Sequence, residues 1–332
     1  MNTTRSSREA GRPPKRELLE MLRAFAGRRI LVWADLGVDR YLWGAPKRVS
    51  REAPVLILGV RKEWWVPGGG ANAVMNLRAM GGRPLPLGAV GDDEDGARLL
   101  ECFRGCGIPV GHIRKVKGYR TVSKTRVLAG PETGVKQQVV RYDREEPLPE
   151  GVRIVPDGGA KADALVVSDY GYHTVDPAAL RKIRPSMPVV VDSRFRLLEF
   201  PGVAAVTPNE EEAAFAAGTS IGCDADAESA GRKILGALKA GTLLMTRGSR
   251  GILLMEPKRA PRAIPAHGDG EVADTTGAGD TVLAAFTLGL ASGFPPGHAA
   301  FLANIAGALK VRKLGTATVS AEELRREIEA SL

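Results

Sequence analysis

The sequence predicts an α/β fold with a mainly parallel central sheet flanked by helices and a small β lid. Short apolar runs alternate with helical stretches along most of the 332 residues, as expected for strands buried on both faces. Two longer, half-polar segments near 40–66 and 115–145 interrupt this alternation, and the second contains the turn GPETG, as in an antiparallel hairpin. Both are inserted between units of the sheet, so we expect a lid over its carboxyl edge, where ligands bind.

The elements of the main sheet can be assigned in order along the chain. RILVWADLG, from Arg29, is the first predicted strand, and GGGANAVMNLRAMGG is a helix that glycines open and close. RPLPLGAVGDDEDGARLLECFRGCG predicts a second strand and helix. The later strands are predicted in ADALVVSDY, PVVVDS, VAAVTPN and GTLLMTRG, separated by helices in EEEAAFAAG and DAESAGRKILGALKAG. Residues 29–328 are therefore expected to form one domain.

Composition limits the classes of function. The 47 Lys and Arg exceed the 38 Asp and Glu, and this net charge of +9 suits anionic ligands. Much of the excess lies in residues 1–28, interpreted as a basic tail with a short helix from about Arg16 to Phe25. Because the chain has 17 aromatic residues (8 Phe, 4 Trp, 5 Tyr), stacking platforms for nucleic acid are not expected.

The sequence also disfavours a secreted, membrane-spanning or zinc-binding protein. Neither a signal-peptide apolar core nor a stretch of about 18 apolar residues is recognisable, so a cytoplasmic protein is expected. Three cysteines and four scattered histidines do not predict a disulfide framework or a zinc site. Cys102 and Cys106 are interpreted as small residues near a helix end that Gly107 closes.

The stretch DTTGAGDT at 274–281 is the strongest candidate for chemistry. A helix start presents unpaired backbone N–H groups, and glycines let an anion approach them closely. The amides of Gly277, Ala278 and Gly279 can stabilise negative charge on a phosphoryl group, while Asp280 takes the proton of an attacking hydroxyl. Glycine turns before helices are often plain connections, so this stretch alone leaves both interpretations open.

Together, DTTGAGDT, the earlier PGGGANAVMNL and the intervening TPNEEE resemble the ribokinase-like family of sugar kinases, the phosphofructokinase-B type. The resemblance covers residues 29 to about 325. It implies that Asp280 is the catalytic base, that 277–279 form the anion hole, and that ATP and Mg²⁺ are used.

The resemblance also assigns residues around the nucleotide. Asn209 and Glu212 match the pair that organises magnesium and the triphosphate through water. Asp274, with the backbone near Thr276 and the KLGTATVS loop at Gly315, matches the position that commonly holds a monovalent cation such as K⁺. The positions that match the nucleotide-binding strand-turn and the adenine-flanking helix are Thr246, Gly248, Gly251 and Asn304. The alternatives for these last four are a hairpin turn and a helix-surface amide.

The acceptor pocket is predicted at the end of the first strand. The family places there an acid that hydrogen-bonds sugar hydroxyls, and Asp35 and Asp39 are the candidates, with Asp39 preferred. The residues expected to line the same pocket are Gly69, Gly70, Asn72 and Asp169 of VVSDY.

Within the family, VVSDY, QQVVRYDREE, SKTRVL and KLGTATVS are similar to kinases that phosphorylate D-glycero-D-manno-heptose 7-phosphate at its anomeric hydroxyl, for ADP-heptose and lipopolysaccharide synthesis. An acceptor that is already phosphorylated fits Lys124, Arg126 and Arg141 in the lid, whose alternative is a solvated strand. GYH replaces the subfamily's Ala-Lys-Gly after VVSDY, and DSR replaces DPK, so Arg194 is expected in place of a lysine. The His-x-Gly-His signature of a fused nucleotidyltransferase is not found, which predicts kinase activity alone.

Two alternatives remain at this stage. One is a kinase of another sugar or sugar phosphate, of the fructose or tagatose phosphate type. The other is a non-catalytic sugar- or nucleotide-binding regulator, which the presence of Asp280 disfavours. Exposed lid edges tend to be covered, so a homodimer through the β lid is expected.

Overall fold

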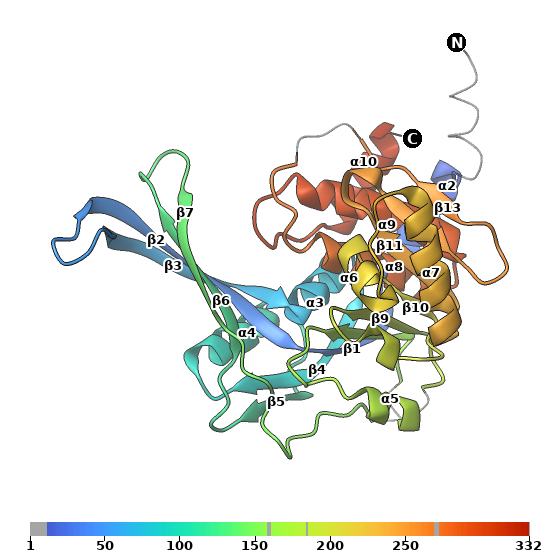
Figure 1. Cartoon of the computed structure of the whole chain (residues 1–332), viewed down its shortest axis with the longest axis horizontal. Helices are drawn as coiled ribbons and strands as arrows, with labels where there is room; N and C mark the ends of the chain where they lie inside the picture. Colours follow the sequence, from blue (N-terminus) through green and yellow to red (C-terminus); the bar gives the residue numbers. More distant parts are fainter. Residues whose placement is uncertain (1–11, 158–160, 184, 269–271, 332) are drawn as a thin grey trace, which may run out of the picture.

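The computed structural model describes residues 12–157, 161–183, 185–268 and 272–331. Figure 1 shows an α/β body from which a narrower β-sheet projects to one side. Residues 1–11 of the predicted basic tail lie outside the described part of the chain.

A sheet of nine strands, counted over the described residues, forms the centre of the body. Its order is β13-β12-β11-β10-β9-β8-β1-β4-β5, and β12 and β13 are the antiparallel members. The strands are β1 (Arg29–Ala34), β4 (Arg83–Gly91), β5 (Ile113–Val116), β8 (Ala164–Asp169), β9 (Val189–Ser193), β10 (Ala205–Val206), β11 (Thr242–Thr246), β12 (Ile252–Met255) and β13 (Arg262–Ile264). The mainly parallel sheet predicted from the apolar runs is confirmed.

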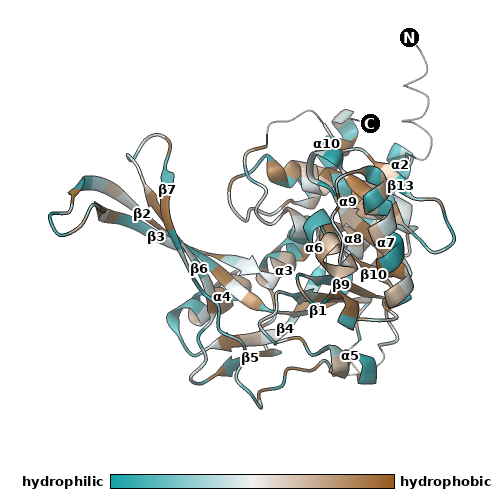
Figure 2. Ribbon diagram, in the orientation of Figure 1, coloured by the Kyte–Doolittle hydropathy of each residue, from teal (hydrophilic) through white to brown (hydrophobic). Residues whose placement is uncertain are grey.

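Helices cover both faces of this sheet. One face packs against α2 (Lys15–Ala24), α3 (Gly70–Ala79), α4 (Glu94–Gly105), α8 (Ala278–Ala291), α9 (Pro296–Val311) and α10 (Ala321–Ser331). The other packs against α5 (Pro177–Ile183), α6 (Glu210–Ala217) and α7 (Asp224–Leu238), with the 3₁₀ turns η1 (Leu197–Glu199) and η2 (Gly248–Arg250) beside strands β9 and β11. In Figure 2 the hydrophobic colour is concentrated on the strands between these layers.

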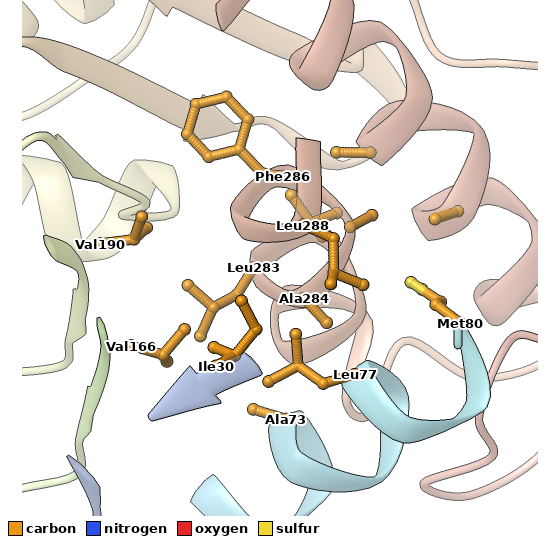
Figure 3. Close-up of a cluster of buried hydrophobic side chains, with 14 of the residues drawn as sticks. Ile30, Ala73, Leu77, Met80, Val166, Val190, Leu283, Ala284, Phe286 and Leu288 are labelled. Carbon is orange, nitrogen blue, oxygen red and sulfur yellow. The ribbon is translucent and has the colours of Figure 1, made fainter. Parts of the chain in front are cut away.

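Side chains that alternate between the two faces of β1 pack against both helical layers. Ile30 and Val32 point to the first helical layer, whereas Leu31 and Trp33 point to the second, as a period of two requires. In Figure 3, Ile30 and its neighbours on β8 and β9 meet Leu283 and Ala284 of α8. Because these α8 side chains pack on the middle strands, α8 and the glycine turn before it lie directly against the centre of the sheet.

The folded body begins before Arg29, which is earlier than the sequence predicts. Three side chains of α2 and the residue after it, Leu18, Met21, Leu22 and Phe25, are buried in the first helical layer. The apolar spacing of this helix matches one buried face. The helix predicted from Arg16 to Phe25 is therefore present as α2 and forms part of the body.

The lid is a separate four-stranded sheet with the order β3-β2-β6-β7. Its strands are β2 (Leu36–Val49), β3 (Leu56–Gly69), β6 (Val122–Ala129) and β7 (Gln137–Arg144). β2 starts two residues after β1 ends, and β3 runs directly into α3, so the base of the lid lies at the carboxyl edge of the main sheet. Residues 115 and 116, at the start of the second predicted lid segment, instead belong to β5, which pairs with β4 in the main sheet.

Candidate active site

The glycine turn at the start of α8 has the geometry of an anion site. Gly277 has a φ of 79°, and a Cβ there would lie 2.4 Å from Asn72 Nδ2, so a side chain is excluded. The N–H of Ala278 donates to the carbonyl of Thr275 (3.1 Å), which, within the described part of the chain, leaves the amides of Gly277 and Gly279 for a ligand. Two of the three predicted amides are thus available to an anion.

Asp280 lies in the first turn of α8 and is only 5% exposed. Its Oδ2 accepts a hydrogen bond from Asn72 Nδ2 (2.8 Å), and its Oδ1 accepts one from the Tyr170 hydroxyl (3.2 Å). Burial raises the pKa of the Asp280 carboxyl to about 7, with the charges of Asp39 and Glu212 adding to the effect and the two hydrogen bonds opposing it. A carboxylate with this pKa is suited to general-base catalysis near neutral pH.

Asn72 is held in position by a second asparagine one helical turn later. Asn76 Nδ2 donates to Asn72 Oδ1 (3.2 Å), so the Asn72 amide presents its NH₂ group to Asp280. Asn76 Oδ1 in turn accepts from the Thr281 hydroxyl (3.1 Å) and the backbone N–H of Val319 (3.3 Å). Asn72, predicted to line the sugar pocket, therefore contacts the candidate base itself.

The sequence analysis missed Tyr170 and Asn76. The available signals were an Asn-x-x-x-Asn spacing on a helix that opens with glycines, and a tyrosine directly after a buried strand. Neither signal shows by itself that the side chain reaches Asp280, because α3, β8 and α8 meet only in the folded body.

Asp39 on β2 lies at the base of the lid and is 3% exposed. Arg126 Nη1 of β6 lies 2.5 Å from Asp39 Oδ1, and both side chains are almost excluded from solvent. A small pocket beside them is lined by Gly69, Tyr170 and Lys124 as well as Asp39. The preferred acceptor-binding acid thus lies in a pocket with Tyr170, whose hydroxyl also reaches Asp280.

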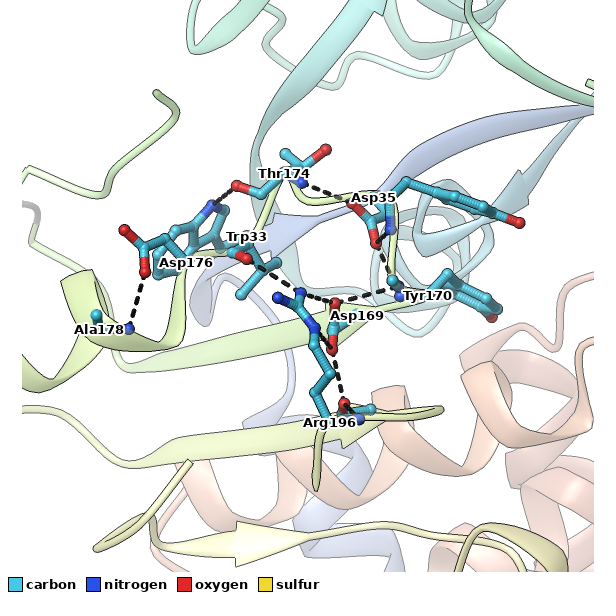
Figure 4. A network of polar contacts seen from close by, with 12 residues as sticks. Trp33, Asp35, Asp169, Tyr170, Thr174, Asp176, Ala178 and Arg196 are labelled. Atoms are coloured by element: carbon cyan, nitrogen blue, oxygen red, sulfur yellow. Dashed lines mark hydrogen bonds and ion pairs between the residues drawn. The ribbon is translucent and has the colours of Figure 1, made fainter. Parts of the chain in front are cut away.

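Asp35 and Asp169 have a role that differs from the predicted contact with substrate (Figure 4). The Asp35 carboxylate accepts backbone N–H bonds from Tyr170 (2.8 Å), Tyr172 (3.0 Å) and Thr174 (3.0 Å). Asp169 pairs with Arg196 and accepts from the Ser193 hydroxyl (2.7 Å). Both carboxylates hold the loop that carries Tyr170, so we assign them to positioning, although Asp35 also lines the small pocket beside Asp39.

The glycines at the base of the lid bring α3 onto β1. A Cβ on Gly70 would lie 2.5 Å from that of Ala34, whereas the glycine N–H donates to the Asp35 carbonyl (3.0 Å). Gly69 lines the small pocket beside Asp39. Gly70 therefore sets the distance between the helix and the strand, whereas Gly69 lines the pocket.

The predicted basic residues fall into two groups. Lys124 joins Arg126 near Asp39, where it pairs with Glu145 and Asp143 and lies 3.4 Å from the Tyr172 hydroxyl. Arg141 of β7 lies opposite Arg126 in the strand register, on the same face of the lid, and pairs with Asp143 (2.7 Å). The exposed Arg194 lies apart from these three, 5.2 Å from the Phe195 ring centroid. Lys124 lines the small pocket, and Arg126 pairs with Asp39, which also lines it.

The predicted magnesium residues form the start of α6. Asn209 and Glu212 make a reciprocal capping box, in which each side chain accepts the other's backbone N–H (2.8 and 2.9 Å). Burial raises the pKa of the Glu212 carboxyl, and burial together with the charges of Glu212 and Asp280 raises that of Asp192, a residue the sequence analysis did not assign. Acids that repel one another at one site favour a cation, so this arrangement fits Mg²⁺.

No three His, Cys, Asp or Glu side chains gather closely enough, over the residues that are described, to bind a metal by themselves. A magnesium ion here would take further oxygen ligands from the triphosphate and water, as is usual for this ion.

Of the remaining predicted nucleotide-side residues, Thr246 is a neighbour of that acid cluster. Thr246 ends β11 and donates its N–H to the Pro208 carbonyl (3.0 Å), beside Asn209. Gly248 and Gly251 flank the η2 turn of a β11–β12 hairpin. Asn304 donates to the Pro265 carbonyl (2.6 Å), so its amide fixes the segment after β13.

The predicted monovalent-cation residues come together, but the oxygens of Asp274 already have donors. The Asp274 carboxylate accepts the N–H groups of Thr276 (2.8 Å) and Gly315 (2.8 Å). The carbonyl oxygen of Asp274 accepts from the Lys310 ammonium (2.9 Å), a group that the sequence analysis did not assign.

Known proteins are similar to this chain over most of its length. Residues 41–324 match the pfkB family carbohydrate kinases. The chain is 37% identical over 319 residues to the "Bifunctional protein HldE" of Caulobacter vibrioides, and 38% identical over 324 residues to that of Geobacter sulfurreducens. These alignments cover 92% and 93% of the chain, which spans 65% of the length of each relative.

Solved structures show the same fold at low identity. Arabidopsis thaliana ribokinase complexed with ribose and ATP superposes with a TM-score of 0.73 at 18% identity, covering 92% of this chain and 100% of that one. Phosphofructokinase-2 from Escherichia coli in complex with potassium has a TM-score of 0.70 at 18% identity, covering 91% and 98%. The predicted ribokinase-like fold is confirmed.

Proposed function

The chain belongs to the pfkB family of carbohydrate kinases, and from that membership we propose that its acceptor is D-glycero-D-manno-heptose 7-phosphate. The kinase transfers the γ-phosphoryl group of ATP to the anomeric hydroxyl, and the product is the 1,7-bisphosphate used for ADP-heptose synthesis. The heptose motifs of the sequence and the identity to HldE proteins support this choice of acceptor.

One observation carries the catalytic part of the proposal, namely the buried Asp280 carboxylate between Asn72 and Tyr170. In the proposed reaction Asp280 takes the proton of the attacking hydroxyl while the new O–P bond forms and the bond between the γ-phosphorus and the β–γ bridging oxygen breaks, releasing ADP. The amides of Gly277 and Gly279 stabilise charge on the phosphoryl group in transit. Mg²⁺ bound with ATP supplies charge neutralisation, and Asp192, Asn209 and Glu212 are the residues that would hold it.

The acceptor enters between the base of the lid and the carboxyl edge of the sheet. Asp39 is proposed to accept hydrogen bonds from sugar hydroxyls, and Lys124 and Arg126 to meet the acceptor's own phosphate. Both cations are already largely buried beside acids, so phosphate binding does not require either one to move into the site from solvent. These contacts distinguish a phosphorylated acceptor from a free sugar.

The proposal is tested by ADP release across a panel of acceptors with ATP and Mg²⁺. The panel contains heptose 7-phosphate, fructose 6-phosphate, tagatose 6-phosphate and the free sugars, and Asp280→Asn serves as the inactive control. Turnover of the heptose phosphate that collapses in the variant supports the proposal. Turnover of another sugar alone would retain the fold and the base but overturn the acceptor, and no turnover at all would favour the regulator.

We also propose that two lids cover each other in a homodimer. All eight residues of β7 are exposed, and among them Val139 and Val140 are 48% and 50% exposed, while Val60 of β3 is 60% exposed. An edge strand with apolar side chains on both faces is usually covered. Light scattering at micromolar concentration tests this, with a dimer expected and Val140→Asp expected to give monomers; a monomeric wild type would refute it.

In the described ranges no helix is long and apolar enough to cross a membrane. A cytoplasmic location fits a kinase that uses ATP, and it stays a prediction.

A further inference from the structure

Lys310 is one of the largest fully buried side chains of the described structure. It lies in the last turn of α9 and is 0% exposed, although its ammonium carries a charge that is costly to bury. An isolated ammonium would be expelled or neutralised in such a place, so its surroundings must compensate the charge.

The surroundings consist of oxygens from two loops. Lys310 Nζ donates to the backbone carbonyls of Asp274 (2.9 Å) and Lys313 (3.3 Å). The Asp274 carboxylate adds a nearby negative charge, and the carboxyl end of α9 adds the negative end of the helix dipole. This is the environment of a bound monovalent cation, with carbonyl dipoles converging on a single positive charge.

The same oxygens belong to the loops that the family resemblance assigns to a free monovalent cation. A potassium ion coordinated by the Asp274 carbonyl would meet the Lys310 ammonium, a like charge, at the same oxygen. The Asp274 carboxylate oxygens are also engaged by Thr276 and Gly315. The residues present therefore do not fit a free K⁺ ion.

We propose that the Lys310 ammonium is a built-in replacement for the monovalent cation, which makes this kinase independent of K⁺. The ammonium joins the turn before α8 to the loop after α9, and through Asp274 this holds Thr276 and Gly315 next to the Gly277 turn. A tethered cation is always in place, so no ion needs to bind to order the anion site. The inference rests on the family membership and not on the identity of the sugar acceptor.

The test compares thermal unfolding in about 0.1 M KCl and in the same concentration of choline chloride, which keeps ionic screening constant. Wild type is expected to unfold at the same temperature in both salts. Lys310→Ala leaves the oxygens in place without their cation, so it is expected to lose stability in choline and to recover about 5 °C in KCl. Lys313→Ala is the matched control, because it removes a neighbouring ammonium but keeps the Lys313 carbonyl, and it is expected to show no K⁺ effect.

Two outcomes would overturn the proposal. One is a wild-type protein that KCl stabilises over choline, a measurement that needs no variant to fold. The other is a folded Lys310→Ala protein that is indifferent to K⁺.

A crystal of the Lys310→Met variant soaked in RbCl tests directly whether a free cation can occupy the site. Methionine keeps most of the aliphatic part of the lysine side chain and removes the ammonium. An anomalous peak between the Asp274 and Lys313 carbonyls is expected in the variant and not in wild type, and a peak in wild type would contradict the proposal. Turnover follows the same pattern for whichever acceptor is used, with K⁺ dependence expected in the variant alone. Failure of the heptose assignment would therefore leave this test intact.

Discussion

Replacing Asp280 by asparagine should stabilise the protein while it abolishes catalysis. The native carboxyl has a pKa raised to about 7 from an ordinary value of 3.8, so the native state holds its proton more tightly than the unfolded state does. Stability is consequently lost as pH rises from about 4 to about 7. At 1.36 kcal/mol per pKa unit, the carboxylate costs the native state about 4 kcal/mol at pH 8 and about 1.6 kcal/mol at pH 5.

Asparagine removes this pH-dependent cost and loses part of one hydrogen bond, worth about 1 kcal/mol. The variant is therefore expected to be about 3 kcal/mol more stable than wild type at pH 8 and nearly equal to it at pH 5. The difference between the two pH values, about 2 to 3 kcal/mol, does not depend on the hydrogen bond that is lost.

The assay is urea unfolding at both pH values, followed by tryptophan fluorescence, with turnover measured on the same samples. Asp92→Asn supplies a matched control, because the Asp92 side chain is 68% exposed and a surface change of this kind is worth less than about 0.5 kcal/mol. An equal gain at both pH values, or a loss of stability at pH 8, would refute the assignment of Asp280 as a buried carboxylate with a raised pKa.

The other predictions concern the same site. The logarithm of kcat/KM should rise with pH and level off above about pH 7, and a flat profile from pH 5 to 8 would argue against Asp280 as the base. Tyr170→Phe removes a hydrogen bond that lowers the Asp280 pKa, so the profile should move to higher pH; an unchanged midpoint would contradict that contact. Arg126→Met leaves Asp39 buried without its partner, so a loss of about 3 kcal/mol by urea unfolding is expected, and Arg126→Met with Asp39→Asn should recover most of it. Arg126→Met should also raise KM for the sugar phosphate far more than KM for ATP; an equal rise in both would remove Arg126 from the acceptor site.

The sequence was most informative where function and local geometry use the same residues. Gly277 and Asp280 could be proposed because DTTGAGDT occurs together with PGGGANAVMNL and TPNEEE, a combination that resembles a kinase family. The strands of the main sheet could be predicted because each is apolar on both faces. The parallel sheet, the lid and the family followed from these signals.

The contacts between elements could not be found in this way. Asp35 and Asp169 each follow a buried strand, as ligand-binding acids often do. In the folded protein, however, Asp35 binds backbone amides of the loop after β8, and Asp169 pairs with Arg196. Tyr170 reaches Asp280 only because β8 and α8 are neighbours in space. In the sequence, Lys310 looks like an ordinary lysine near the end of a helix. Its burial depends on how α9 packs against the loop at Asp274.

The most direct test of the account is ³¹P NMR of the reaction of ATP and Mg²⁺ with heptose 7-phosphate. The account predicts a new anomeric phosphate resonance and equimolar ADP with wild type, and neither with Asp280→Asn. A product without the anomeric phosphate, or an Asp280→Asn variant as active as wild type, would contradict it.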